Sequence, residues 1–179
     1  MFLNHRQKER IATIGGTFDT LHAGHKEYIQ LAFEFADRVW IYVSSDEFAS
    51  GQKKYPVQPY EIRLEKLLEH LHQTVEHGRY QIRRLHGLGE LQKDYLEAAE
   101  LRDKIYAAIV SPEYYDYFQN LNCLREIRGL RSFLTVVKRR TLTKDKHDLS
   151  SYEVRKRLPV NGKHLIVEAE PEALISNAA

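Results

Sequence analysis

Two histidines three residues apart stand near the start of the chain, within the run Gly15-Gly16-Thr17-Phe18-Asp19-Thr20-Leu21-His22-Ala23-Gly24-His25. Adjacent glycines let a backbone approach a bulky anion and adopt unusual dihedral angles. A helix that begins just after them offers N–H groups and the positive end of its dipole to a phosphate. His22 and His25 can face one point across Gly24, where both imidazoles could donate hydrogen bonds to phosphoryl oxygens. The Thr17 hydroxyl adds a donor, so the run predicts a phosphate site.

Parts of this run have simpler interpretations. Gly-Gly-Thr alone is a common tight turn, and a His-x-x-His pair can bind a metal ion. Because no cysteine and no acidic cluster lie nearby in the sequence, we expect no metal ligands from the protein side chains. The complete run, placed where a first strand turns into a helix, is a much stronger signal than any of its parts.

The strands and helices that would position this run alternate along the chain. Short apolar runs predict strands at 11–15, 39–43, 80–85, 105–110 and 133–137. Helical spacing predicts helices at 24–36, from about 61 to 75, after Ser111-Pro112-Glu113, and at 150–158. Between these elements, 44–59 is expected to be a polar loop and 87–89 a turn. Such alternation indicates a five-stranded parallel sheet covered on both faces, in a single doubly wound, Rossmann-like α/β domain.

In sheets of this kind, ligands bind at the carboxyl ends of the strands. The turn after Gly15 lies at that edge, and so do the segments that contain Lys53, Lys54 and Lys138-Arg139-Arg140. These basic residues could attract phosphate or simply be solvated. We assign the whole chain, 1–179, to one domain, with a core over about 10–158 and a tail over 160–179 that has no clear period.

Composition excludes several classes of protein. The chain has 179 residues, of which 42% are hydrophobic, and a net charge of +2, so it is neither disordered nor a strongly basic coat protein. Its single cysteine, Cys123, cannot form an intramolecular disulfide, which suits a reducing cytoplasm. The apolar runs are strand-sized, which argues against a membrane span or a signal peptide.

Charge is concentrated toward the end of the chain. Residues 125–163 carry twelve basic and four acidic residues, a net charge of +8, which predicts a polyanionic ligand, either a nucleotide or a nucleic acid. Because no RNA-binding motif accompanies this basic third, we favour a small-molecule substrate and expect no nucleic-acid partner. The sequence does not specify an oligomeric state.

The opening run resembles the signature of the nucleotidyltransferase superfamily, in which a His or Thr is followed by any residue and then Gly-His. Further segments, at 44–48, 54–63, 110–113 and 121–130, resemble those of phosphopantetheine adenylyltransferases of the archaeal and eukaryotic type. This resemblance implies transfer of the adenylyl group of ATP to 4′-phosphopantetheine, with Mg²⁺ accompanying the ATP. The products would be dephospho-coenzyme A and pyrophosphate, in coenzyme A biosynthesis.

The resemblance also implies roles for individual residues. His25 would stabilise the pentacovalent α-phosphate, His22 would contact the nucleotide phosphates, and Lys54 with Thr17 would position the acceptor phosphate. The remaining residues implied to bind nucleotide or substrate are Gly15, Gly16, Phe18, Asp19, Gly24, Arg128, Ser150, Ser151 and Arg155. Arg128 belongs to a series with Arg125 and Arg131, for which the alternative is the solvated face of a helix and its exit.

One motif departs from the family pattern. The family's late ISSTRIR-type motif corresponds here to Leu149-Ser150-Ser151-Tyr152-Glu153-Val154-Arg155, with tyrosine and glutamate in place of threonine and arginine. Ser150 and Glu153 have the spacing of a helix capping box, but the glutamate puts negative charge where a polyphosphate would bind. Two alternatives therefore stay open: a related cytidylyl- or adenylyltransferase with another phosphate acceptor, and a catalytically degenerate nucleotide-binding protein of the same fold.

Overall fold

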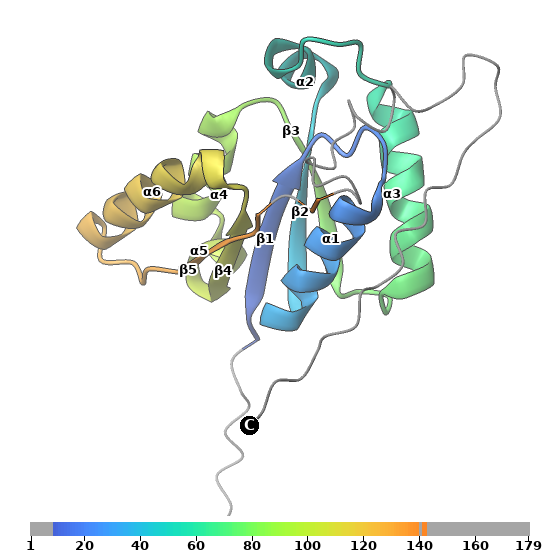
Figure 1. Ribbon diagram of the computed structural model, residues 1–179. Helices are drawn as coiled ribbons and strands as arrows, with labels where there is room; N and C mark the ends of the chain where they lie inside the picture. Colours follow the sequence, from blue (N-terminus) through green and yellow to red (C-terminus); the bar gives the residue numbers. More distant parts are fainter. Residues whose placement is uncertain (1–8, 140, 143–179) are drawn as a thin grey trace, which may run out of the picture.

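The protein, described by a computed structural model over residues 9–139, 141 and 142, is built on a five-stranded sheet (Figure 1). All four strand pairings are parallel, and the strand order is β3-β2-β1-β4-β5. The strands are β1 (Ile11–Gly16), β2 (Arg38–Ser44), β3 (Tyr80–Leu85), β4 (Ile105–Val110) and β5 (Leu134–Val137). Each predicted strand lies within one or two residues of its observed bounds, and the predicted fold class is confirmed.

Helices cover both faces of this sheet. In Figure 1, α1 (Ala23–Phe35) and α3 (Tyr60–Thr74) lie on one side, and α4 (Leu88–Glu97), α5 (Ala99–Lys104) and α6 (Tyr115–Ile127) lie on the other. Alternate side chains of each strand enter opposite cores, since successive residues of a strand point to opposite faces. Val39, Ile41 and Val43 pack toward α1 and α3, whereas Trp40 and Tyr42 pack toward α4 and α6. Burial on both faces explains why the strands are almost continuously apolar.

The order of the strands creates a switch point between β1 and β4. From β1 the chain proceeds outward through β2 to β3, and it then crosses back to β4 on the other side of β1. The loops that follow β1 and β4 therefore leave in opposite directions and open a crevice at the carboxyl ends of the strands. The Gly-Gly-Thr turn follows β1 at this point.

Two expectations about connecting segments were wrong. The expected loop at 44–59 contains the short helix α2 (Asp46–Gln52), whose first turn is capped by the Ser45 hydroxyl accepting from Phe48 N at 3.2 Å. The expected turn at 87–89 is instead the start of α4, because Leu91 and Tyr95 need a helix to reach the core together. Ser111-Pro112-Glu113 does begin a helical segment, the 3₁₀ turn η1 (Pro112–Tyr114) that leads into α6.

The longest helix of the described ranges, α3, has 15 residues, and none there combines the length and apolarity that a membrane span requires. The predicted helix at 150–158 lies outside the described residues.

Candidate active site

A cavity of about 410 Å³ opens at the switch point, within the size range typical of small-molecule sites. One wall consists of the end of β1 and the turn after it, together with the first turn of α1. The end of β4, the beginning of η1 and the segment that follows β5 also contribute to the lining. Gly15, Gly16, Thr17, Phe18, His22, Gly24 and His25 all line this cavity, so the structure gathers most of the predicted site in one place.

The turn after β1 is shaped by Gly16 and Phe18. A Cβ on Gly16 would lie 3.3 Å from the Phe18 ring, so glycine lets that ring pack closely against the turn. Phe18 has a φ of 51°, in the left-handed region that residues with a side chain rarely adopt. Its buried ring lies 5.3 Å from the His25 ring, centroid to centroid. Packing thus holds a strained backbone at the cavity wall, where such strain commonly accompanies function.

The two imidazoles stack on each other. His22 is the N-cap residue of α1 and His25 lies in its first turn, and the ring centroids are 3.9 Å apart at an interplanar angle of 21°. Nδ1 of His25 donates to the carbonyl oxygen of Thr20 over 2.9 Å. Because a carbonyl can only accept, this hydrogen bond fixes a proton on Nδ1 and leaves Nε2 as the ring nitrogen for a ligand.

Burial disfavours the protonated, charged form of both imidazoles. It lowers the pKa of His25 to about 3, with a smaller contribution from His22. Burial and then the Lys138 ammonium lower the pKa of His22 to about 4, against an opposing effect of Glu27. Both rings are therefore neutral at pH 7 in this structure. A phosphate beside them would favour the protonated forms, which can donate from both nitrogens.

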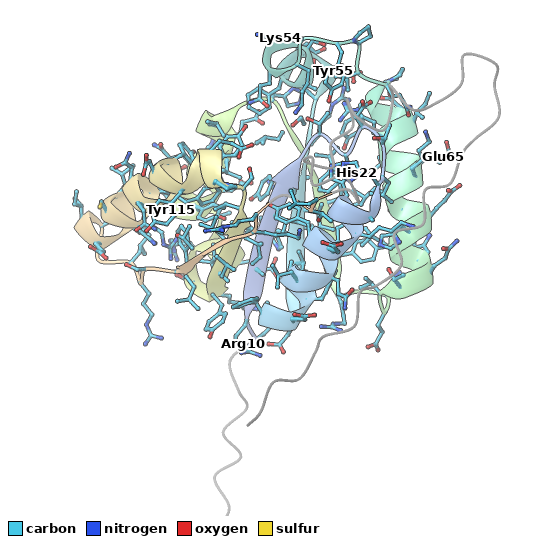
Figure 2. All side chains as sticks on the ribbon, in the orientation of Figure 1. Arg10, His22, Lys54, Tyr55, Glu65 and Tyr115 are labelled. Atoms are coloured by element: carbon cyan, nitrogen blue, oxygen red, sulfur yellow. The ribbon has the colours of Figure 1, made fainter. Side chains whose placement is uncertain are left out.

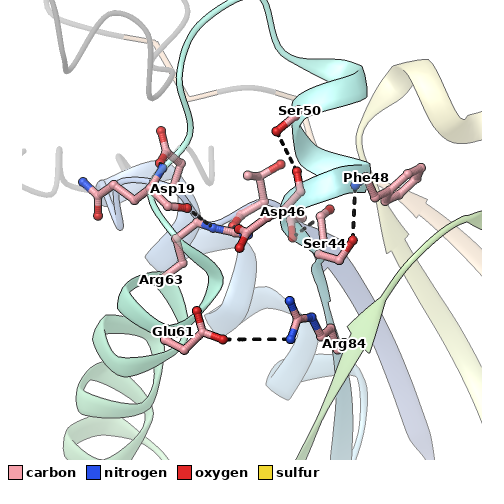
Figure 3. Close-up of polar contacts among 12 residues, drawn as sticks. Asp19, Ser44, Asp46, Phe48, Ser50, Glu61, Arg63 and Arg84 are labelled. Carbon is pink, nitrogen blue, oxygen red and sulfur yellow. Dashed lines mark hydrogen bonds and ion pairs between the residues drawn. The ribbon is translucent and has the colours of Figure 1, made fainter.

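Arg63 stabilises the turn between β1 and α1, and its side chain is drawn in Figure 3. Its side chain is fully buried and donates to the Thr17 carbonyl at 2.6 Å, to the Gln58 carbonyl at 2.8 Å and to Asp46 Oδ1 at 2.8 Å. That hydrogen bond to Arg63 holds the pKa of Asp46 below its ordinary value. One guanidinium thus joins the β1–α1 turn to α2 and to the segment before α3.

Asp19 joins two of the same segments instead of contacting the cavity. It is 1% exposed, its Oδ1 accepts from Gln58 N at 2.8 Å, and it is absent from the cavity wall. The structure thus places Asp19 where it joins the loop before α3 to the β1–α1 turn, and substrate binding by this residue stays a prediction.

The basic loop after α2 contributes a different lysine from the one expected. Gln52, Lys53 and Tyr55 line the cavity, whereas Lys54 does not. Figure 2 shows Lys54 and Tyr55 beside α2, and His22 near the start of α1. The Lys53 ammonium also contributes to lowering the pKa of His25, which places its charge toward the imidazoles.

The segment after β5 brings further basic residues to the site. Lys138 and Arg139 line the cavity, together with Thr141. A Cβ on Gly24 would lie 3.2 Å from both the His22 ring and the Thr141 hydroxyl, so glycine at this position lets the segment lie against the start of α1. Of the three residues Lys138-Arg139-Arg140, the structure thus places the first two on the cavity wall, and the third lies outside the described residues.

An apolar wall lies on the α4 and α6 side of the cavity. It was not predicted, because its side chains come from five separate elements, and it comprises Tyr42, Phe48, Leu85, Leu88, Leu91 and Phe118. Tyr28, also on the cavity wall, donates its hydroxyl to the Ile109 carbonyl and so joins α1 to the end of β4. The site consequently has a polar half around the histidines and an apolar half facing it.

Of the remaining predicted residues, those within the described part of the chain lie away from the cavity. Arg128 ends α6 as an exposed C-cap residue and is absent from the cavity wall. Arg125 is 1% exposed and donates to the carbonyls of Tyr95, Arg102 and Arg131, so it belongs neither to a solvated face nor to a ligand site. Ser150, Ser151 and Arg155 lie outside the described residues.

Known proteins match this chain over most of its length. Residues 13–157 match the cytidylyltransferase-like family. A phosphopantetheine adenylyltransferase of Methanopyrus kandleri is 32% identical over 146 residues, which cover 82% of this chain and 88% of that protein. A bifunctional phosphopantetheine adenylyltransferase/NTP phosphatase of Thermoplasma acidophilum is 28% identical over 159 residues. That alignment spans 87% of this chain but only 45% of the longer relative.

Solved structures share the fold. The bifunctional NMN adenylyltransferase/ADP ribose pyrophosphatase of Francisella tularensis superposes with a TM-score of 0.56 at 15% identity, over 83% of this chain and 41% of that one. At this identity the likeness concerns the arrangement of strands and helices alone.

Proposed function

The chain belongs to the cytidylyltransferase-like family, and on that premise we propose that it transfers the adenylyl group of ATP to 4′-phosphopantetheine. The products are dephospho-coenzyme A and pyrophosphate, which makes the protein a nucleotidyltransferase of coenzyme A biosynthesis. The observation that carries this proposal is the stacked pair His22 and His25 on the wall of a cavity at the sheet's switch point. The matched relatives, named for the same activity, support the choice of substrates.

The reaction requires positioning more than covalent catalysis. An oxygen of the acceptor phosphate attacks the α-phosphorus of ATP and forms a new P–O bond, while the bond to the bridging oxygen of pyrophosphate breaks in line. Both reactants are anions, so holding them together and neutralising the charge that develops lowers the barrier. His25, protonated once the phosphates are bound beside it, donates from Nε2 to an oxygen of the pentacovalent phosphorus, and the neighbouring ring of His22 contacts the nucleotide phosphates.

The acceptor phosphate lies between Thr17 and the basic loop after α2. Because Lys53 lines the cavity, the role predicted for Lys54 is transferred in this proposal to its neighbour. The apolar wall that contains Phe48, Leu88 and Leu91 receives the pantetheine arm, whose methyl and methylene groups gain from leaving water. A cavity that is polar on one side and apolar on the other suits an acceptor with one charged end.

Mg²⁺ enters this proposal with the nucleotide. No group of three or more His, Cys, Asp or Glu side chains in the described part of the chain could hold a metal ion. The ion would be held by the phosphates of ATP, where it offsets their charge. The contributions predicted for Ser150, Ser151 and Arg155, and a cytoplasmic location, stay predictions.

A direct assay tests the proposal against its alternatives. Purified protein is incubated with ATP, CTP or GTP and, in separate reactions, with 4′-phosphopantetheine, glycerol phosphate or nicotinamide mononucleotide, and pyrophosphate release is measured. We expect turnover with ATP and 4′-phosphopantetheine to exceed every other pair at least tenfold. Preference for another pair would favour a related transferase. Calorimetry that detects no binding of any nucleoside triphosphate in the presence of Mg²⁺ would favour a degenerate protein.

A further inference from the structure

Lys138 is the first residue after β5 and lies on the cavity wall. Its backbone N–H donates to the Val110 carbonyl at 2.8 Å, which extends the pairing with β4 by one residue. Its side chain is only 17% exposed and lines the cavity together with His22. The backbone pairing with β4 thus fixes the position of Lys138, and its ammonium group lies in the polar half of the cavity.

The ammonium group of Lys138 contacts three acceptors that it can leave for another anion. Nζ lies 3.2 Å from Glu27 Oε2, 3.1 Å from the Thr141 hydroxyl and 3.3 Å from the Arg139 carbonyl. The Thr141 hydroxyl also donates to Glu27 Oε2 at 2.6 Å. Glu27 is 49% exposed, so water can solvate its carboxylate if the lysine turns to another anion. The contact is a partly solvated pair, of the kind that contributes little by itself to stability.

Lys138 is also close enough to the histidine pair to act on it electrostatically. Its charge lowers the pKa of both His22 and His25, after the larger effect of burial. The positive charge of Lys138 would therefore also attract an anion that contacts His22. A lysine is a point charge with three rotatable donors, which suits the terminal oxygens of a polyphosphate.

We propose that Lys138 binds the β- or γ-phosphate of the nucleotide and leaves Glu27 when the nucleotide arrives. This inference rests on the proposed nucleotidyltransferase function and adds to it a residue that distinguishes triphosphates from monophosphates. The competing explanation is that the contact of Lys138 and Thr141 with Glu27 only fastens these two residues to α1.

Two matched variants separate these explanations, because Lys138→Gln and Glu27→Gln break the same ion pair but only the first removes the cation. Binding of Mg-ATP and of AMP is measured by calorimetry without acceptor. We expect Lys138→Gln to weaken ATP binding about 10- to 100-fold and AMP binding less than about threefold, since AMP lacks the β- and γ-phosphates. Glu27→Gln should bind ATP at least as tightly as wild type, and Lys138→Arg within about fivefold of it.

Three results would overturn the proposal: unchanged ATP affinity in Lys138→Gln, an equal loss of affinity in Glu27→Gln, and an equal loss for AMP. If Lys138→Gln does not fold, acetylation of wild-type lysines is followed by mass spectrometry. ATP should then protect Lys138 more strongly than AMP does, and equal protection would contradict the assignment. Since no acceptor is present, a wild type that binds ATP but makes no dephospho-coenzyme A refutes the proposed function without deciding the role of Lys138.

Discussion

Replacing Arg63 by methionine should destabilise the protein far more than the same replacement of Arg84. The two arginines are both drawn in Figure 3, but their surroundings differ. The Arg63 side chain is fully buried and makes three hydrogen bonds of 2.6 to 2.8 Å, one of them to Asp46. Arg84 forms one ion pair with Glu61 at 3.9 Å, with side chains that are 38% and 73% exposed.

These contacts set the magnitude of the expected difference. Removing one partner of a buried ion pair costs about 3–5 kcal/mol. Because the Asp46 side chain is 42% exposed and can be rehydrated, we expect the lower end, about 3 kcal/mol, for Arg63→Met. An exposed pair contributes about 0–1 kcal/mol, which is the expectation for Arg84→Met. Typical domain stabilities of about 5–15 kcal/mol leave both variants mostly folded.

Urea unfolding at pH 7, followed by circular dichroism, gives the free energy of unfolding of each variant. Adenylyl transfer is then measured at a temperature at which both variants are folded. Arg63→Met should lower kcat, because the Thr17 carbonyl loses its buried donor and the turn beside His25 can move. Arg84→Met should leave kcat unchanged. A stability difference between the variants below about 1 kcal/mol would refute the interpretation that Arg63 stabilises the turn between β1 and α1.

Three further predictions concern the same turn and the opposite core. Since the pKa of His25 (about 3) and of His22 (about 4) are lowered in the fold, the unfolded chain binds more protons below pH 6.5. Stability should therefore fall as pH drops from 6.5 toward 4, at up to about 2.7 kcal/mol per pH unit for two protons. A variant with both His22→Gln and His25→Gln should lose less free energy of unfolding than wild type between pH 6.5 and 4, as measured by urea titration. An equal loss in both proteins would contradict the role of the two histidines. Gly24→Ala should lower kcat/KM at least tenfold without lowering Tm, because its Cβ would lie 3.2 Å from the His22 ring. Gly51→Ala, in open space on α2, is the control and should keep full activity. Arg125→Met should cost about 3 kcal/mol in urea, because three carbonyls lose a buried donor, and a loss below about 1 kcal/mol would argue against that role.

Local patterns were sufficient for the sheet and for the first turn of the site. The strands are continuous apolar runs, and the opening run lies in adjacent residues whose geometry a strand–helix turn fixes. The connecting helices were harder to predict from pattern alone. α2 has only seven residues and includes Gly51, while Gly87 and Gly89 suggested a turn although α4 begins between them. In both places packing of the following apolar side chains decides the structure.

Contacts between side chains that are far apart in the sequence could not be predicted from local sequence patterns. Arg63 acts on Thr17, Asp46 and Gln58, which approach one another only in the folded chain. Its position between Tyr60 and Leu67 on the buried face of α3 was a usable signal, since a charged residue there must find partners. The path of the loop after α2, which the sequence does not specify, places Lys53 instead of Lys54 on the cavity wall.

The fate of the α-phosphorus of labelled ATP shows whether the protein transfers the adenylyl group and whether His25 is needed for it. Wild type, His25→Ala and His77→Ala, an exposed histidine between α3 and β3, are incubated with α-³²P-labelled ATP, Mg²⁺ and 4′-phosphopantetheine. We expect label in dephospho-coenzyme A for wild type and His77→Ala, and a rate about a hundredfold lower, or lower still, for a folded His25→Ala. Label that never reaches the acceptor would refute adenylyl transfer, and a His25→Ala variant as fast as wild type would refute the role of His25.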